Sequence, residues 1–375
     1  MMDNKSQVNI TWREMIQKSC RSTNDIVQIF KLNDDEIIRM DRITEKYPMC
    51  VNPYYLSLIN ADSRNGPIFK MAIPDLNEFS EGGIPDTSGE AENTVITGMQ
   101  HKYKQTALIL STNQCAMYCR HCFRKRMVGA SGEEVAKYLP AMAGYIKSHK
   151  EINNVLISGG DSFMLDCRVI KKYLEYLTPI RNIEFIRFGT RIPVVLPQRI
   201  TEDDELLSVF SKFNKKKQLY IVTQFNHPHE LTPESKEAIL ALQSAGCVVR
   251  NQTVLLRGVN DDPDTLALLM NELTAHGILP YYIFQCRPAS GVRNLFQLPL
   301  IRGCEIIDEA KKKMNGQSKG FRYCMSHLTG KIEILGKAVG EDTILFKYHQ
   351  AKHDKDESRI FTKKVKLEQG WLDNI

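Results

Sequence analysis

Long hydrophobic runs are missing from this chain of 375 residues. No stretch of about 18 apolar residues occurs, so a membrane-spanning helix is not expected. The first residues also lack the apolar segment of a secretory signal, which favours a cytoplasmic location. Low-complexity tracts and internal repeats are absent too. With 42% hydrophobic and 25% charged residues, the composition is that of a globular protein.

A strong excess of one charge is also absent. The formal net charge is +6, and the basic residues are spread along the chain instead of forming a tail. No recognised nucleic-acid-binding module is present, so nucleic acid is not expected as a partner. The chain has ten cysteines but no secretory signal. Such cysteines are more typical of reduced thiols and metal ligands than of a disulfide framework.

Three of the ten cysteines, Cys115, Cys119 and Cys122, stand together in the segment CAMYCRHC. A closed structural metal site takes four ligands, so this segment is one short. One interpretation is a zinc site completed by His121 or a distant cysteine, in a protein that binds nucleic acid through RHCFRKRM. The favoured interpretation is a four-iron cluster held by three thiolates, with one iron left open for chemistry.

Short β-rich segments alternate with segments of helical spacing from just before the cysteines onward. Six such units in series predict an α/β fold with a parallel sheet, open or curled into a partial (β/α)6 barrel. Ligands of such sheets bind at the carboxyl ends of the strands, and the cysteines follow the first strand. We divide the chain into a helical N-terminal lobe and linker (1–100), the barrel (101–317) and a C-terminal lobe (318–375). The predicted strands are TALILST, NNVLISGG, IEFIRFG, QLYIVTQF, VVRNQTVLL and YYIFQC.

The C-x3-C-x2-C spacing after the first strand resembles the radical S-adenosylmethionine (SAM) enzymes. Further motifs, in order, resemble the lysine 2,3-aminomutase family: CAMYCRHCFRKR, SGGD, GTRIPVVLPQRIT, FNHPHE, NQTVLLRGVND and YYIFQC. The resemblance covers about residues 11 to 345. It implies a radical SAM barrel and an isomerase that moves the amino group of a free amino acid from Cα to Cβ.

The same resemblance implies three cofactors, namely a [4Fe-4S] cluster, SAM and pyridoxal 5'-phosphate (PLP). It also implies an external electron donor such as flavodoxin or ferredoxin, and a homo-oligomer is compatible with it. A radical SAM enzyme on the same scaffold without PLP is the main alternative.

For the cluster and SAM, the resemblance implies that the three cysteines hold the iron. It implies that the turn Ser158, Gly159, Gly160 and Asp161 contacts the SAM amino group, and that Gln252 hydrogen-bonds SAM. Glycines at such a turn let the backbone approach a ligand closely.

For PLP, the resemblance implies Lys331 as the catalytic lysine that binds the cofactor, with Lys337 as a second candidate. The glycine-rich stretch that precedes this lysine in relatives is largely replaced here. Lys102 and Tyr103 match positions that resemble phosphate contacts, whereas Thr106 stands where relatives often place an arginine.

For the substrate, the resemblance implies that Arg124 grips the α-carboxylate, whereas its neighbours Lys125 and Arg126 are expected to be solvated. Lysine-specific relatives place an acidic residue where this chain has Arg287. A lysine ammonium would be repelled there, so glutamate or another acidic amino acid is favoured over lysine. A structural ion pair is the alternative role for Arg287. No cysteine follows Cys324, so the C-terminal zinc site of relatives is not expected.

Overall fold

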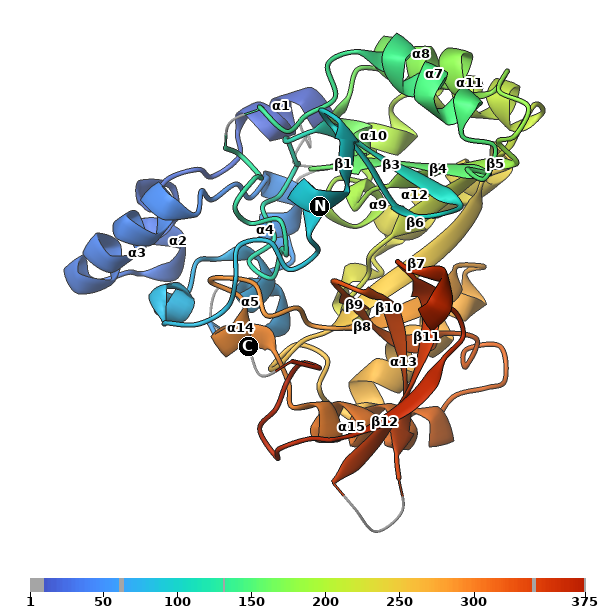
Figure 1. Ribbon diagram of the computed structural model, residues 1–375. Coiled ribbons are helices and arrows are strands. Elements are labelled where there is room, and N and C mark those ends of the chain that lie inside the picture. The colour runs from blue at the N-terminus through green and yellow to red at the C-terminus, as the bar shows by residue number, and fades with distance from the viewer. Residues whose placement is uncertain (1–9, 61–63, 131, 339–341, 374–375) are drawn as a thin grey trace.

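The computed structural model describes residues 10–60, 64–130, 132–338 and 342–373 (Figure 1). Short helices joined by loops are the main secondary structure of the described residues before Thr94. Several of them start at side chains that cap the helix, as Thr11 and Asn33 do by accepting a backbone N–H. The helices of this part are α1 (Trp12–Gln17), α2 (Asn24–Phe30), α3 (Asp34–Lys46), α4 (Pro53–Ser57), α5 (Pro67–Ala72) and α6 (Glu90–Asn93).

A sheet of 12 strands, ordered as in the chain, runs through the rest of the described residues. Strands β3 to β9 are parallel, and antiparallel strands extend the sheet at both ends. The first six strands are β1 (Thr94–Ile96), β2 (Met99–Tyr103), β3 (Thr106–Thr112), β4 (Asn154–Gly159), β5 (Phe185–Gly189) and β6 (Gln218–Thr223). The others are β7 (Val248–Leu255), β8 (Leu279–Gln285), β9 (Arg322–His327), β10 (Gly330–Lys337), β11 (Thr343–Ala351) and β12 (Ile360–Lys364).

Helices connect the parallel strands, so the prediction of an α/β fold with six strand–helix units is confirmed. Strands β3 to β8 are the six predicted strands. One helix begins later than its sequence pattern suggests, at Leu139, because Pro140 is tolerated only in a first turn. These helices are α7 (Leu139–Ser148), α8 (Cys167–Leu177), α9 (Ile192–Val195), α10 (Gln198–Thr201), α11 (Asp204–Asn214), α12 (Pro233–Ser244), α13 (Pro263–Ala275), α14 (Arg293–Phe296) and α15 (Leu300–Lys312).

The two faces of the parallel strands differ in burial. In β5, Ile186 and Phe188 are fully buried on one face, whereas Phe185 and Arg187 on the other face are only partly buried. We call this second face the inner face, because the sheet curls and brings its two halves together around it. This curl brings Lys104, just before β3, close enough to Asp354, just after β11, to form an ion pair at 3.2 Å. No helix of the described residues is long and apolar enough to cross a membrane.

Candidate active site

The cysteine loop follows the carboxyl end of β3 and is held by the N-terminal helical part. Tyr118 N donates to Cys50 O and Arg120 N to Met71 O, each at 2.9 Å. Burial and, to a smaller extent, the neighbouring thiols raise the pKa of Cys115 well above its ordinary value and that of Cys122 to about 11. Without iron these two thiols are therefore protonated near neutral pH, and binding a metal must release protons.

The residues around the loop fit an iron–sulfur cluster in their chemistry, since its donors are three thiols. Cys119 and Cys122 line a small cavity beside Tyr118 and Lys125. His121 is not turned toward the sulfurs but has its Nε2 3.0 Å from Gln224 Nε2 and 3.2 Å from Asn226 Nδ2. Among the described residues, no three His, Cys, Asp or Glu side chains are placed to hold a single metal ion.

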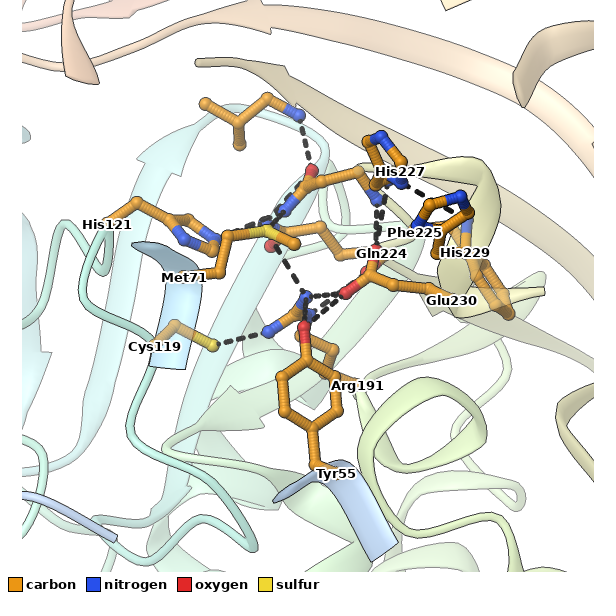
Figure 2. A network of polar contacts seen from close by, with 12 residues as sticks. Tyr55, Met71, Cys119, His121, Arg191, Gln224, Phe225, His227, His229 and Glu230 are labelled. Atoms are coloured by element: carbon orange, nitrogen blue, oxygen red, sulfur yellow. Dashed lines mark hydrogen bonds and ion pairs between the residues drawn. The ribbon is translucent and has the colours of Figure 1, made fainter. Parts of the chain in front are cut away.

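Arg191, in the loop after β5, connects the cysteine loop to a buried polar network (Figure 2). Its Nη1 donates to Cys119 Sγ at 2.9 Å, and its Nε donates to Gln224 O at 3.1 Å. Glu230, which is fully buried, pairs with the same guanidinium. Tyr55 donates to Glu230 at 2.7 Å, so the N-terminal helix α4 also helps to fix Arg191. The network holds one cation beside one of the three sulfurs.

The SGGD turn lies against the cysteine loop. A Cβ on Gly159 would be 2.3 Å from Thr112 O, and one on Gly160 would be 2.4 Å from Gln114 O. Gly159 also has φ +123°, which favours glycine. The buried Asp161 carboxylate accepts from Thr190 Oγ1 and from Arg191 N, each at 2.6 Å. This turn therefore fixes the positions of the β3 and β5 loops.

Gln252 and Ser158 remain available for a ligand. Gln252 lies on β7, is partly exposed, and makes no side-chain hydrogen bond within the described part of the chain. Ser158 is also partly exposed on β4. Neither side chain is used up by the fold, so both stay predicted SAM contacts.

Arg124 is buried and shares a carboxylate with Arg126. Arg124 Nε lies 2.7 Å from Glu90 Oε1, and Arg126 Nη2 lies 2.9 Å from Glu90 Oε2. The expectation that Lys125 is solvated is wrong, because its side chain is buried and pairs with Glu78 at 2.7 Å. Arg126 also departs from that expectation, since only a quarter of its side chain is exposed.

Arg287 lies near Arg124, and one aromatic ring contacts both. The guanidinium carbon of Arg287 is 4.0 Å from the centre of the Phe123 ring, and that of Arg124 is 4.7 Å from it. Arg287 also donates to Ser88 Oγ. Burial lowers the pKa of Arg287 to about 10 despite the opposing effect of Glu90. The structural ion pair considered as an alternative is not found among the described residues.

Lys331 lies at the start of β10, on the inner face, and is 9% exposed. Its Nζ is 4.2 Å from the ring centre of Tyr282, 5.8 Å from that of Phe284 and 5.9 Å from that of Tyr103. Burial lowers its pKa to about 7. Lys337, the second candidate, is exposed. A buried amine with a low pKa is suited to bind a carbonyl cofactor.

Lys102 lies close to this part of the inner face. Its Nζ donates to His327 O at 2.6 Å and to Ser88 O at 3.1 Å. Burial, and then the charge of Arg287, lower its pKa to about 7. Two carbonyl oxygens thus already accept hydrogen bonds from Lys102 Nζ. Contact between this amine and the phosphate of PLP remains a prediction.

Several residues of the site were not assigned a role from the sequence, namely Glu90, Phe123, Arg191, Glu230, Tyr282 and Phe284. Arg191, Glu230 and the three aromatics lie within the motifs that resemble the family, so their position in a motif was the available signal. Glu90 had no such signal, since it lies in the linker before β1.

Comparisons with known proteins give relatives that match most of the chain. The L-lysine 2,3-aminomutase of Fusobacterium nucleatum is 36% identical to the chain, and the match covers 81% of this chain and 71% of that protein. A protein of Aquifex aeolicus named for the same reaction is 38% identical over 93% of each chain. The glutamate 2,3-aminomutase of Clostridioides difficile is 33% identical over 83% of this chain and 72% of its own length.

Two further comparisons add less. A scan against models of protein families gives no match. A solved structure of native anSMEcpe with bound AdoMet and the Kp18Cys peptide overlaps 55% of this chain and 58% of its own, with a TM-score of 0.42 and 10% identity.

Proposed function

Because the chain belongs to the lysine 2,3-aminomutase family of radical SAM isomerases, we propose that it moves the α-amino group of an acidic amino acid, glutamate first, to the β-carbon. Its relatives are named for lysine and for glutamate, so family membership alone leaves the substrate open. The residues around Arg287 support the choice of an acidic one.

The cofactors supply the radical chemistry: the [4Fe-4S] cluster and SAM generate a carbon radical, and PLP provides the π system for amino migration. The residues of this chain hold and orient these groups. Cys115, Cys119 and Cys122 supply the thiolates, while Gln252 on β7 and Ser158 on β4 offer free polar groups. Lys331 presents to the inner face an amine whose pKa is lowered to about 7, so that a large share of it is neutral at that pH.

The observation that carries the substrate assignment is the missing partner of Arg287. Arg124 has Glu90 within ion-pair distance, but Arg287 has no carboxylate there among the described residues. A substrate with a distal carboxylate would supply that partner with bidentate geometry. A lysine ammonium would add a further cation beside two arginines, at a cost of about several kcal/mol in a buried site.

The test is an anaerobic reaction with SAM, PLP, a reductant and an equimolar mixture of isotope-labelled amino acids. Flavodoxin or ferredoxin, the electron donor we propose, is used in one arm and a chemical reductant in the other. We expect the 3-amino isomer of glutamate as the main product. A product from lysine alone would contradict the substrate assignment. Cleavage of SAM without any β-amino acid product would contradict the aminomutase assignment for free amino acids.

Competition between glutamate and lysine then measures the preference directly. Each amino acid is supplied alone and together, and the two products are quantified by mass spectrometry. The Lys331→Ala variant serves as the control, because it should form neither product while keeping its iron.

A further inference from the structure

The inner face of the sheet carries a group of cations that lack a carboxylate partner. None of them forms an ion pair with a carboxylate of the described residues. Glu90 is already paired with Arg124 and Arg126, and Glu333 with Arg322 at 3.6 Å, while Asp86 attracts Lys102 and Arg287 from beyond ion-pair distance. The unpaired cations are Lys102, Arg187, Arg250, Arg287 and Lys331.

Arg187, on β5, extends toward the amino ends of the neighbouring strands. Its Nη2 lies 2.6 Å from Asn154 Oδ1 and 3.4 Å from Thr106 Oγ1, both neutral acceptors. Its Nε is buried and has no hydrogen-bond partner among the described residues. Burial lowers the pKa of Arg187, and the charge of Arg250 lowers it further. The guanidinium therefore has donor capacity and charge that the protein does not satisfy.

Arg250, on β7, likewise has a hydrogen-bond donor and a charge that the described residues do not satisfy. Its guanidinium carbon lies between two aromatic rings, 5.1 Å from the centre of Tyr220 and 4.9 Å from that of Tyr281. Its Nε is also buried and unpartnered in the part of the chain that the structure describes. Both side chains are partly buried with a buried Nε, a position in which a cation without a counterion is costly, and a bound anion would lower that cost.

A continuous set of contacts links Arg187 to Lys331. Lys331 Nζ lies 5.9 Å from the ring centre of Tyr103, and Tyr103 is paired with Thr106 in the β2–β3 ladder. Thr106 in turn contacts Arg187. A cavity of about 350 Å³ reaches Tyr103 from the side of β11, and its lining includes His349, Gln350 and the carboxylates Asp354 and Glu357 but neither arginine. Gln350 is the strand partner of Lys331.

We propose that Arg187 and Arg250 form a phosphate-monoester site on the inner face and hold the phosphate of the PLP that Lys331 binds. This inference rests on the proposed function, because it needs PLP at Lys331. A phosphate dianion matches two guanidinium groups in charge, and the planar fork of arginine matches its oxygens in geometry. Thr106 itself offers only a hydroxyl. In this arrangement the neighbouring guanidinium of Arg187 supplies the positive charge at that place.

The experiment compares PLP with pyridoxal, which lacks the phosphate. Affinities are measured by absorbance titration and borohydride trapping in the wild type, Arg187→Met and Arg250→Met. The wild type should bind PLP more tightly than pyridoxal, and each variant should lose about 10- to 100-fold of that preference. Pyridoxal affinity itself should change little. Inorganic phosphate should compete with PLP in the wild type and compete less in the variants.

Arg322→Met is the matched control. It removes an arginine that also influences Lys331, but one that has a carboxylate partner and whose side chain is 45% exposed. Its preference for PLP should stay that of the wild type. Arg187→Lys is a second variant that keeps the charge and loses the fork, and we expect an intermediate preference for PLP from it.

The outcomes separate the inference from the proposed function. If the arginine variants keep the full preference for PLP over pyridoxal, the phosphate site is wrong while PLP at Lys331 stands. If the wild type traps neither aldehyde at Lys331, the PLP-dependent function itself is wrong. An equal loss in Arg322→Met would show a general charge effect and would also overturn the site.

Discussion

Arg287 contacts an aromatic ring and a serine hydroxyl but no carboxylate of the described residues, so its charge is open to a ligand. The change Arg287→Asp reverses that charge next to Glu90 and Arg124. If the side chain pairs with the distal carboxylate of the substrate, its loss should cost about 3–5 kcal/mol. We therefore expect the kcat/KM for glutamate to fall by about two to four decades. Turnover of lysine should improve relative to glutamate.

The measurement compares both amino acids in the wild type and the variant under the same reductant. SAM cleavage without substrate should barely change, which separates a specificity effect from damage to the cluster. Arg302→Asp, on the exposed side of α15, is the control for charge reversal. An unchanged ratio of glutamate to lysine turnover would show that Arg287 has a structural role.

Lys331 provides a prediction of pH dependence. Its pKa is lowered to about 7 by burial, with smaller contributions from Arg187, Arg287 and Arg322 and an opposing one from Cys324. Only the neutral amine attacks the PLP aldehyde. The rate of adduct formation should therefore rise with pH through about 7 and level off above it, instead of rising up to the ordinary range of a lysine.

Stopped-flow absorbance of the apoprotein mixed with PLP measures this profile. Lys331→Ala should abolish the trapped adduct and keep the iron, whereas Lys337→Ala, at an exposed position, should behave as the wild type. A profile that still climbs near pH 10 would indicate an exposed lysine as the attachment site. Peptide mapping of the adduct would identify it.

At the scale of single elements, the turn after β4 supports the cysteine loop through close backbone contact. Gly160→Ala would place a Cβ 2.4 Å from Gln114 O, one residue before Cys115. We expect a loss of about 1–3 kcal/mol in the free energy of unfolding, together with reduced iron content. Chemical denaturation and iron analysis after anaerobic reconstitution measure the two effects.

Gly144→Ala is the matched control, because no atom lies within 4 Å of the added Cβ and the residue is inside α7. That change should stabilise the protein by about 0.5–1 kcal/mol and leave the iron content unchanged. If Gly160→Ala and Gly144→Ala had the same free energy of unfolding, the turn would have accommodated the added Cβ without strain.

The sequence predicted the strands and most helices because their signals are local. Burial alternates along β7, and α12 and α13 begin at a capping side chain followed by proline. The motifs likewise predicted the cysteines after the first strand of the barrel and Gln252 on its fifth strand, whereas Lys331 was expected in the C-terminal lobe. In the structure, the cysteine loop follows β3, Gln252 lies on β7 and Lys331 on β10.

The contacts between elements could not be predicted in the same way. Arg191 and Cys119 are 72 positions apart, and Arg124 and Glu90 are 34 apart. Lys125 stands in a run of three basic residues, which is usually a solvated surface, yet Glu78 meets it from the N-terminal part. Ion pairs of this kind depend on how elements pack, which no local pattern records.

At the scale of the whole molecule, the last described residues return to the sheet. Leu300 N donates to Gln369 O at 2.8 Å, and Gln285 Nε2 donates to Gly370 O at 2.9 Å. Trp371 is 3% exposed and packs near His327 of β9. Figure 1 shows this end of the chain close to α14, so it connects the C-terminal strands with the loop after β8.

Trp371→Ala should therefore destabilise the protein by about 3–5 kcal/mol, because a large buried side chain is lost. Thermal unfolding of the apoprotein measures the effect. Leu367→Ala in the same segment is the control, since Leu367 is 70% exposed and its loss should be nearly neutral. Equal melting temperatures for both variants would show that the segment is not anchored by Trp371.

The unpaired cations of the inner face also affect the stability of the molecule. Like charges that face one another without counterions favour unfolding, and every anion that binds among them shifts the equilibrium back by mass action. At a hundredfold excess over its Kd, one such ligand adds about 2.7 kcal/mol. The enzyme should thus be most prone to unfold when it is newly made and empty, and its supply of PLP and acidic amino acid should set how long it survives in the cell.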